Sequence, residues 1–241
     1  PGPGHGHVLM PRPAAPARGV LAAWSVHALE IRPVRVSVPA GPAHAELWLT
    51  NPDGAPWSGQ ARLYRWEQAG DQEQLVPATD LAVSPARLEI APGQRQRVRV
   101  VRLGAVPDAV QQGYRLVISP DTGVGDARYS LPVFVEPDRP VPPVPRLQVG
   151  TEGSPSAPRL HLYNDGDGHA GLADLVFVDA QGRRQPLIDG LAGYVLPRSA
   201  RRWDLPPRPD GYAGGRFRAR LNDAAEALLP AVIAPAPGTE L

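Results

Sequence analysis

From Leu29 onward, apolar and polar residues alternate in short runs, and this pattern constrains the fold more than any other feature of the chain. A period of two places successive side chains on opposite faces of a β-strand, so each run predicts a strand with one buried face. The 31 prolines and 25 glycines lie largely between these runs, as turn residues do. No helix-length pattern competes with them. Residues 29–138 are therefore predicted to form an antiparallel β-sandwich of immunoglobulin type.

The first half of the chain contains the clearest runs. Pro33 interrupts the first of them, and because proline lacks a backbone N–H it predicts a sheet edge or a break between two half-strands. Trp57 and Trp66 are interpreted as core residues, although exposed aromatic side chains could instead stack on nucleic-acid bases. The expected strands are residues 29–38, 45–49, 60–68, 87–90, 98–103, 114–118 and 129–135.

A proline-rich stretch then divides the chain. Five prolines fall within residues 137–145, which predicts a stiff, extended connector. The alternating pattern resumes after it and predicts a second, smaller sandwich. Residues 223–229 are interpreted as a loop leading to a final strand at 231–233. The remaining strands are expected around 160–162, 175–178, 194–196, 202–205 and 216–221.

These patterns divide the chain into four segments, and the first carries features of an export signal. Arg12 and Arg18 precede a short apolar stretch that ends in small residues, which is typical of a secretory signal peptide. The alternative is a disordered tail rich in proline and alanine. The division is a tag or signal-like disordered segment at 1–28, an N-terminal domain at 29–138, a linker at 139–145 and a C-terminal domain at 146–241.

Composition excludes several classes of function. A formal net charge of +1 gives no strong field for nucleic acid, and no apolar run is long enough for a membrane-spanning helix. Cysteine is absent, which excludes disulfides and thiolate chemistry. No phosphate loop, zinc-protease helix or nucleophile elbow is present. We therefore predict no enzyme and no cofactor.

Two further clusters carry alternatives. His161 and His169 could share a metal across a hairpin, but no third ligand stands at useful spacing, so no metal site is predicted. Arg95, Arg97 and Arg99 would share one face of a strand. They are interpreted as a solvated, charged face that discourages aggregation, or alternatively as a clamp for a carboxylate or phosphate.

Several segments, in this order, resemble the periplasmic pilus chaperones of the chaperone–usher pathway. Residues 81–85, followed by Ile90-Ala91-Pro92-Gly93-Gln94 and 98–100, are the most specific match, and 129–135 and 193–197 are similar to the archaic branch that builds Csu-type and spore-coat-U-type pili. The resemblance covers about residues 29–235. The other matching segments are 31–36, 49–51, 60–66 and 114–116.

The resemblance implies two immunoglobulin-like domains set at an angle, with a cleft between them. It implies that the protein lends an edge strand to a pilin-like subunit whose own sandwich lacks its last strand, a form of β-strand addition known for this family. The subunit would then pass to an outer-membrane usher without ATP. An exposed edge strand also makes self-association plausible.

The resemblance also implies particular site residues. Arg35 matches the first-strand arginine that binds the terminal carboxylate of the subunit. The second basic anchor of the family, a lysine, aligns with Pro132, so we expect Arg99 to substitute for it, with Arg115 or Arg128 as alternatives.

The donor strand departs from the family pattern. Apolar side chains for the subunit groove could come from Val124, Ala127, Tyr129 and Leu131, and two of these are small or offset. A shorter donor strand, an unusual subunit groove or a degenerate relative with little donor activity would each explain this. The alternative function is a two-domain structural or adhesion module that donates no strand.

Overall fold

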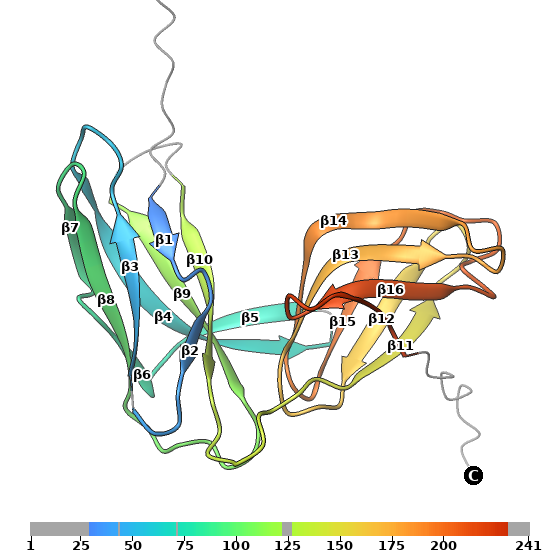
Figure 1. Ribbon diagram of the computed structural model, residues 1–241, viewed down its shortest axis with the longest axis horizontal. Helices are drawn as coiled ribbons and strands as arrows, with labels where there is room; N and C mark the ends of the chain where they lie inside the picture. Colours follow the sequence, from blue (N-terminus) through green and yellow to red (C-terminus); the bar gives the residue numbers. More distant parts are fainter. Residues whose placement is uncertain (1–28, 43, 71, 122–126, 231–241) are drawn as a thin grey trace, which may run out of the picture.

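The computed structural model describes a chain of β-strands arranged as two sandwiches at an angle (Figure 1). Within the described part every regular element is a strand, and it contains no helix long and apolar enough to cross a membrane. The prediction of an all-β, two-domain immunoglobulin-like fold is confirmed. The described residues are 29–42, 44–70, 72–121 and 127–230.

The first sandwich consists of two β-sheets whose strands are mostly antiparallel. One has the strand order β1-β3-β8-β6, and the other has the order β2-β10-β9-β4-β5, with β7 also paired to β4. The strands are β1 (Glu30–Arg32), β2 (Val36–Val38), β3 (His44–Thr50), β4 (Trp57–Ala69), β5 (Gln72–Pro77), β6 (Leu81–Ser84), β7 (Arg87–Ile90), β8 (Arg95–Arg102), β9 (Gln112–Pro120) and β10 (Tyr129–Val135).

The alternation in the sequence explains which side of each sheet faces inward. In β8, Val98 and Val100 are fully buried in the core, whereas Arg97 and Arg99 between and beside them face outward. Leu116 and Ile118 of β9 enter the same core from the opposite sheet. Burial of such side chains contributes roughly 1.5–3 kcal/mol each relative to exposure, which makes this core the main stabilising element of the domain.

Pro33 breaks the first strand as predicted. β1 pairs with β3 in one sheet, whereas β2 pairs in parallel with β10 in the other sheet. The chain therefore crosses between the two sheets at Pro33, Val34 and Arg35. This crossing matters for the site described below, because it places Arg35 at the beginning of β2.

The second sandwich has its own core and consists of the sheets β11-β12-β15 and β14-β13-β16-β17. Residues 226–228, expected to be a loop, form the short strand β17, because they pair with β16 and Glu226 binds Arg184 and Arg218. The expected strand at 231–233 lies outside the described residues. The strands are β11 (Leu147–Glu152), β12 (Arg159–Asn164), β13 (Ala170–Val178), β14 (Arg184–Val195), β15 (Ser199–Asp204), β16 (Arg216–Leu221) and β17 (Glu226–Leu228).

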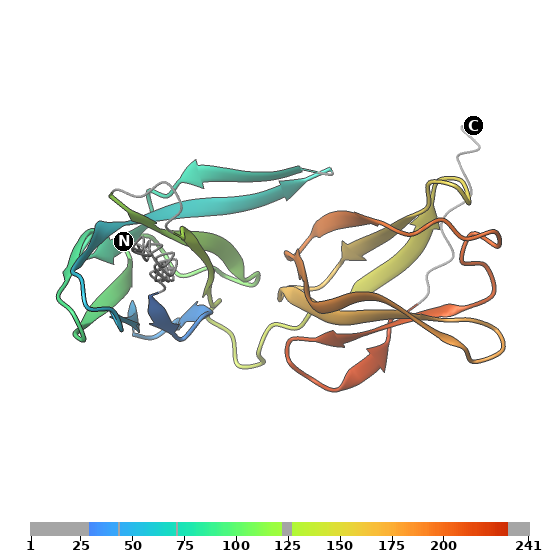
Figure 2. The ribbon, with the colours of Figure 1, turned by 90° about the horizontal axis from the view of Figure 1, so that it is seen from above.

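A small apolar cluster joins the two sandwiches. Trp66 is 5 % exposed, yet it lies on the outer face of its sheet and packs with Phe134 against Leu196 of the second sandwich. The interpretation of Trp66 as a sandwich-core residue was therefore wrong. Gly113 makes this approach possible, because a Cβ there would lie 2.8 Å from a methyl group of Leu196. Figure 2 shows the two sandwiches side by side.

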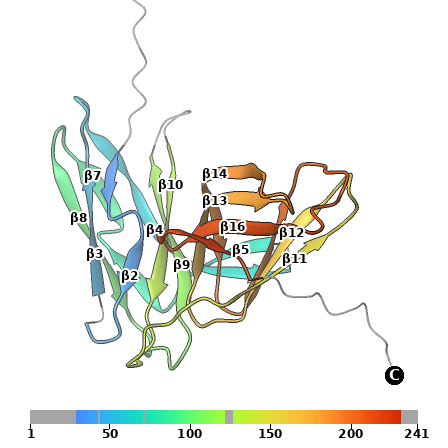
Figure 3. The same ribbon diagram turned by 45° about the vertical axis from the view of Figure 1, so that its right-hand side comes forward.

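Hydrogen bonds across the same junction fix its register. The amide of Gln68 donates to the carbonyl of Tyr194 at 2.8 Å and accepts from the backbone N–H of Leu196 at 2.9 Å. Gln111 accepts from the backbone N–H of His169 at 2.9 Å. The β4–β5 hairpin also extends from the first sandwich toward the second (Figure 3), where Arg201 and Glu73 form an ion pair of 3.8 Å. The angle between the domains is thus held by specific contacts.

Each sandwich contains a buried asparagine at an equivalent place, directly after β3 and at the end of β12. Asn51 donates to the carbonyls of Ala55 and Ile90 at 2.8 and 3.0 Å. Asn164 donates to the carbonyls of Gly168 and Val195 at 2.8 and 3.2 Å. Both side chains replace backbone partners where the strand ends, so buried carbonyl groups remain paired.

We expect Asn164→Leu to lower the free energy of unfolding by about 2–4 kcal/mol, because it leaves two buried carbonyl groups without donors. Urea denaturation followed by tryptophan fluorescence measures this change. Thr151→Ala, at an exposed position of β11, serves as the control and should change stability by less than about 0.5 kcal/mol. Equal effects of the two substitutions would contradict a structural role for Asn164.

Candidate functional site

Arg35 lies at the junction of the two domains, where the chain enters β2. Its guanidinium donates to the carboxylate of Asp223 in the second domain at 2.6 Å. This hydrogen bond raises the pKa of Arg35 and lowers that of Asp223. Tyr194 of the second domain also contributes to the raised pKa of Arg35. Arg35 is therefore a cation held between domains.

The turn between β16 and β17 presents Asp223. Asn222 and Asp223 both adopt left-handed backbone conformations, with φ of 49° and 63°. Asn222 holds the turn against β13, because its side chain accepts from the N–H of Gly171 at 2.7 Å and donates to the carbonyl of His169 at 2.9 Å. A backbone of this kind costs energy in residues other than glycine, so the surrounding bonds must stabilise it. The carboxylate of Asp223 is consequently positioned by the fold.

Arg115 is a second cation at this junction. It lies in β9 opposite Pro132 of β10, on the outer face of the sheet. Its guanidinium stacks over Trp66 at 4.6 Å and donates to the side chain of Ser130 at 3.0 Å. Burial lowers the pKa of Arg115. Among the described residues no carboxylate lies within ion-pair distance of it.

Tyr194 is a common neighbour of both arginines. Its ring meets Trp66 edge-on, with centroids 5.6 Å apart, and its phenol contributes to the electrostatic environment of Arg35 and of Arg115. The two cations thus approach one aromatic side chain from different strands of the first domain. The sequence named Arg115 only as an alternative, because which strand lies opposite Pro132 depends on pairing that a single sequence does not reveal.

The structure does not bring Arg99 to Arg35. Arg99 lies in β8, in the other sheet, on the outer face opposite the core. It pairs with Glu46 of the neighbouring strand at 3.3 Å, and Arg97 approaches the same carboxylate at 3.7 Å. The arginine stripe is therefore a charged outer face with an acidic partner, and the second domain lies on the far side of the sandwich (Figure 1).

The first half of β10 has a free edge. Along its whole length β10 pairs with β9, but β2 covers its other side only from Val133 to Val135. The backbone from Tyr129 to Pro132 therefore has no strand partner on that side among the described elements. An unpaired edge is a template for β-strand addition.

The residues predicted to fill a subunit groove lie differently. Tyr129 and Leu131 both point into the core of their own sandwich, and Leu131 is only 7 % exposed. The hydroxyl of Tyr129 accepts from the backbone N–H of Leu29 at 2.8 Å. Ala127 precedes β10 and is half-buried, and Val124 lies outside the described residues.

His169 completes the junction. Its ring stacks on Phe134 at a centroid distance of 3.7 Å, and its Nδ1 lies 2.7 Å from the side-chain oxygen of Gln111. That oxygen is an acceptor, because the Gln111 amide nitrogen donates to Glu136, so Nδ1 carries the proton. Burial, assisted by the charge of Arg35, lowers the pKa of His169 to about 4. The imidazole is neutral at pH 7, and the described residues contain no cluster of three potential metal ligands around it or elsewhere.

Comparison with known proteins agrees with this architecture. Residues 28–120 match the family described as "Pili and flagellar-assembly chaperone, PapD N-terminal domain". The CsuC chaperone of Acinetobacter baumannii, solved with the tip adhesion subunit CsuE, aligns with a TM-score of 0.68 at 20 % identity over 85 % of this chain and 98 % of that one. A search of curated sequences found no match.

Two further chaperones share the fold. CupB2 of Pseudomonas aeruginosa aligns with a TM-score of 0.57 at 18 % identity, over 83 % of this chain and 97 % of that one. DraB of E. coli aligns with a TM-score of 0.60 at 16 % identity, over 86 % and 97 %. The N-terminal part of the chain, residues 28–120, thus matches the family of pilus-assembly chaperones, as the resemblance predicted, and the solved chaperones share the fold of both domains. This is a family of chaperones and not a class of enzymes.

The low pKa of His169 predicts a specific pH dependence of stability. Its folded pKa of about 4 lies below the unfolded value of about 6.5, so the unfolded chain binds a proton more readily. Its contribution to stability is complete above pH 6.5 and is lost as the pH falls toward 4, by on the order of 3 kcal/mol. We expect urea midpoints of His169→Asn to fall less steeply than wild type between pH 6.5 and 4. Parallel curves would show that His169 does not titrate in this way.

Proposed function

We propose that the protein is a periplasmic chaperone that binds and caps pilin-like subunits by donor-strand complementation and delivers them to an outer-membrane usher. The observation that carries this function is the free edge of β10 beside two cations, Arg35 and Arg115, at the domain junction. The edge supplies backbone hydrogen bonds to an incomplete sandwich, and the cations supply a site for its terminal carboxylate.

The edge accounts for capping without an energy source. A subunit that lacks a strand exposes unpaired backbone groups, and each buried group without a partner costs roughly 1–3 kcal/mol. Tyr129 to Leu131 can satisfy such groups by pairing along the open side of β10. Pro132 has no N–H to donate, and β2 occupies the edge of β10 directly after it. A subunit strand would therefore pair with β10 from Pro132 back toward the start of the strand. The subunit would leave when a neighbour's strand replaces this one.

Arg115 takes the place of the missing lysine in this proposal. It faces Pro132 across the β9–β10 pair, so it lies one strand away from the aligned position. Its planar guanidinium stacks on Trp66, which holds the charge at the junction, and among the described residues no carboxylate forms an ion pair with it, although Glu73 acts on it from a greater distance. Arg99 cannot fill this role from the opposite sheet.

The archaic branch, the usher and the compartment belong to the proposal as well. The likeness to CsuC, described as the chaperone of archaic Csu pili, supports the branch. The signal-like segment at 1–28, outside the described residues, supports export to the periplasm. The open edge would also allow two copies to pair through β10 before a subunit arrives.

One observation favours the second candidate, a two-domain module that donates no strand. The side chains of Tyr129 and Leu131 fill the core of their own sandwich and cannot enter a subunit groove without leaving it. Under this alternative the edge of β10 pairs with nothing, and removal of its hydrogen-bonding capacity has no effect on any partner.

We expect Arg35→Ala and Arg115→Ala each to weaken capture of a co-expressed pilin-like subunit at least tenfold, because each removes a charge-assisted partner of the terminal carboxylate. The measurement is affinity capture from the periplasm with the subunits encoded beside this gene. Arg97→Ala, on the opposite sheet face, is the matched control and should capture as wild type does. A folded wild-type protein that captures no subunit would favour the non-donating module.

Asp223 predicts an opposite effect. Its carboxylate already occupies Arg35, so an incoming carboxylate must compete with it. Asp223→Asn removes the competing charge while the turn keeps its length, and we expect it to raise the affinity for a free-carboxylate subunit peptide about three- to tenfold. Calorimetry with the free and the amidated form of one peptide isolates the carboxylate contribution. An unchanged or lower affinity would show that Asp223 assists binding instead.

A further inference from the structure

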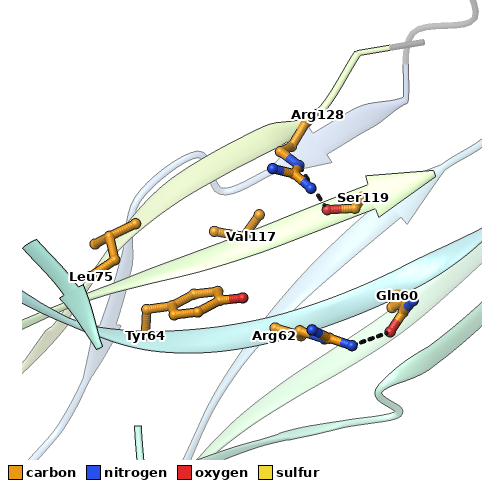
Figure 4. Close-up of a pocket in the computed structure, with 7 residues that line it drawn as sticks. All are labelled: Gln60, Arg62, Tyr64, Leu75, Val117, Ser119 and Arg128. Atoms are coloured by element: carbon orange, nitrogen blue, oxygen red, sulfur yellow. Dashed lines mark hydrogen bonds between the residues drawn. The ribbon is translucent and has the colours of Figure 1, made fainter. Parts of the chain in front are cut away.

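A groove lies on the outer face of the sheet formed by β4, β9 and β10, away from the domain contact. Figure 4 shows that its side chains come from neighbouring strands and from Leu75 of β5. Within it Arg62 donates to Gln60 at 3.1 Å and Arg128 donates to Ser119 at 3.1 Å. The lining residues are Gln60, Arg62, Tyr64, Leu75, Val117, Ser119 and Arg128.

The strand register arranges this face in rows. Tyr64 lies opposite Arg115, and Arg62, two residues earlier in β4, lies opposite Val117. Ser119 lies one row further along and binds Arg128, which directly precedes β10. Three arginines therefore succeed one another from the domain junction to the open end of the sheet.

These three cations differ from most arginines of the chain. Their hydrogen bonds go to the neutral partners Gln60, Ser119 and Ser130, and none of them forms an ion pair within the described residues. By contrast, outward arginines on the opposite sheet share Glu46. Two of these arginines, Arg62 and Arg128, line the groove, and no acidic residue does, so the groove attracts negative charge.

The floor between the arginines is apolar and suits an extended chain. Val117 and the ring of Tyr64 are half-buried, and Leu75 is 46 % exposed beside them. Arg62 lies in β4, and Arg128 directly precedes β10, two strand positions away, so their backbones are separated by about 10 Å or slightly more. In an extended segment, acidic side chains at alternate positions lie about 6.6 Å apart on one side, so two or three of them would span this distance.

We propose that this groove is a docking surface for an acidic, extended segment of the pilus subunit, bound through Arg62 and Arg128 beside the donor edge. This inference rests on the proposed function for the identity of the partner. The subunit is the occupant because the groove is continuous with the free edge of β10: Arg128 directly precedes that strand, and Ser130 lies within it. A strand paired to this edge brings the adjoining parts of the subunit beside the groove.

The first test uses a peptide probe and needs no subunit. The probe is a ten-residue acetylated and amidated peptide with glutamate at alternate positions, and its matched control has glutamine at the same positions. In low salt the arginine Nε–H signals of Arg62 and Arg128 should shift with the glutamate peptide only. Arg62→Gln with Arg128→Gln should weaken its binding about tenfold, whereas Arg97→Gln with Arg216→Gln should not. Equal binding of both peptides, or no shift at Arg62 and Arg128, overturns the docking surface.

The second test separates this inference from the proposed function. Because the probe is amidated and has no terminal carboxylate, Arg35→Ala should bind it as wild type does, even though this variant captures the subunit at least tenfold more weakly. With a captured subunit, the Arg62→Gln and Arg128→Gln pair should slow association about tenfold in low salt and less in high salt, since charges at an interface rim act mainly on the association rate. The inference is overturned if Arg35→Ala loses probe binding, or if the effect of the Arg62→Gln and Arg128→Gln double variant on the association rate does not depend on salt. Probe binding without any subunit capture would refute the proposed function alone.

Discussion

The packing of Trp66 against the second domain is the contact on which the candidate site depends. This indole lies on the outer face of its own sandwich, and it is buried there because Phe134 and Leu196 cover it. Exposing so large an apolar surface would cost several kcal/mol. The contact therefore holds the two domains at one angle. The side-chain amides of Gln68 and Gln111, which hydrogen-bond to the backbone of the second domain, prevent one domain from sliding along the other.

The same contact sets the electrostatics of the junction. The guanidinium of Arg115 stacks on the face of the indole. Tyr194 packs edge-on against the same indole and also raises the pKa of Arg35. His169 stays neutral because the junction buries it against Phe134, so it adds no third positive charge at pH 7. Asp223 of the second domain partly compensates the charge of Arg35. Without the packing of Trp66 the arginines would be ordinary surface charges, which bind a carboxylate weakly.

The sequence predicted where the strands lie better than it predicted which strands pair with one another. Alternation identified β3, β4, β8 and β10, because a half-buried strand requires a period of two. It missed β5, whose residues are all exposed, and β17, whose pairing depends on Glu226 and two distant arginines. Alternation also does not say which sheet a strand joins, and for that reason Arg99 was preferred to Arg115 and Trp66 was assigned to a sandwich core.

The missing lysine and the arginine in β9 have one physical explanation. A lysine on β10 would present a point charge from the proposed donor strand itself, whereas Arg115 reaches the same region from the neighbouring strand and needs a support to fix its longer side chain. Trp66 and Ser130 provide that support through the ring face and the hydroxyl group. Pro132 then carries no charge, and its ring can pack in the buried position that it occupies. A charge on β9 also lies in one line with Arg62 and Arg128, so that the proposed carboxylate anchor and the proposed docking groove are parts of a single positively charged face.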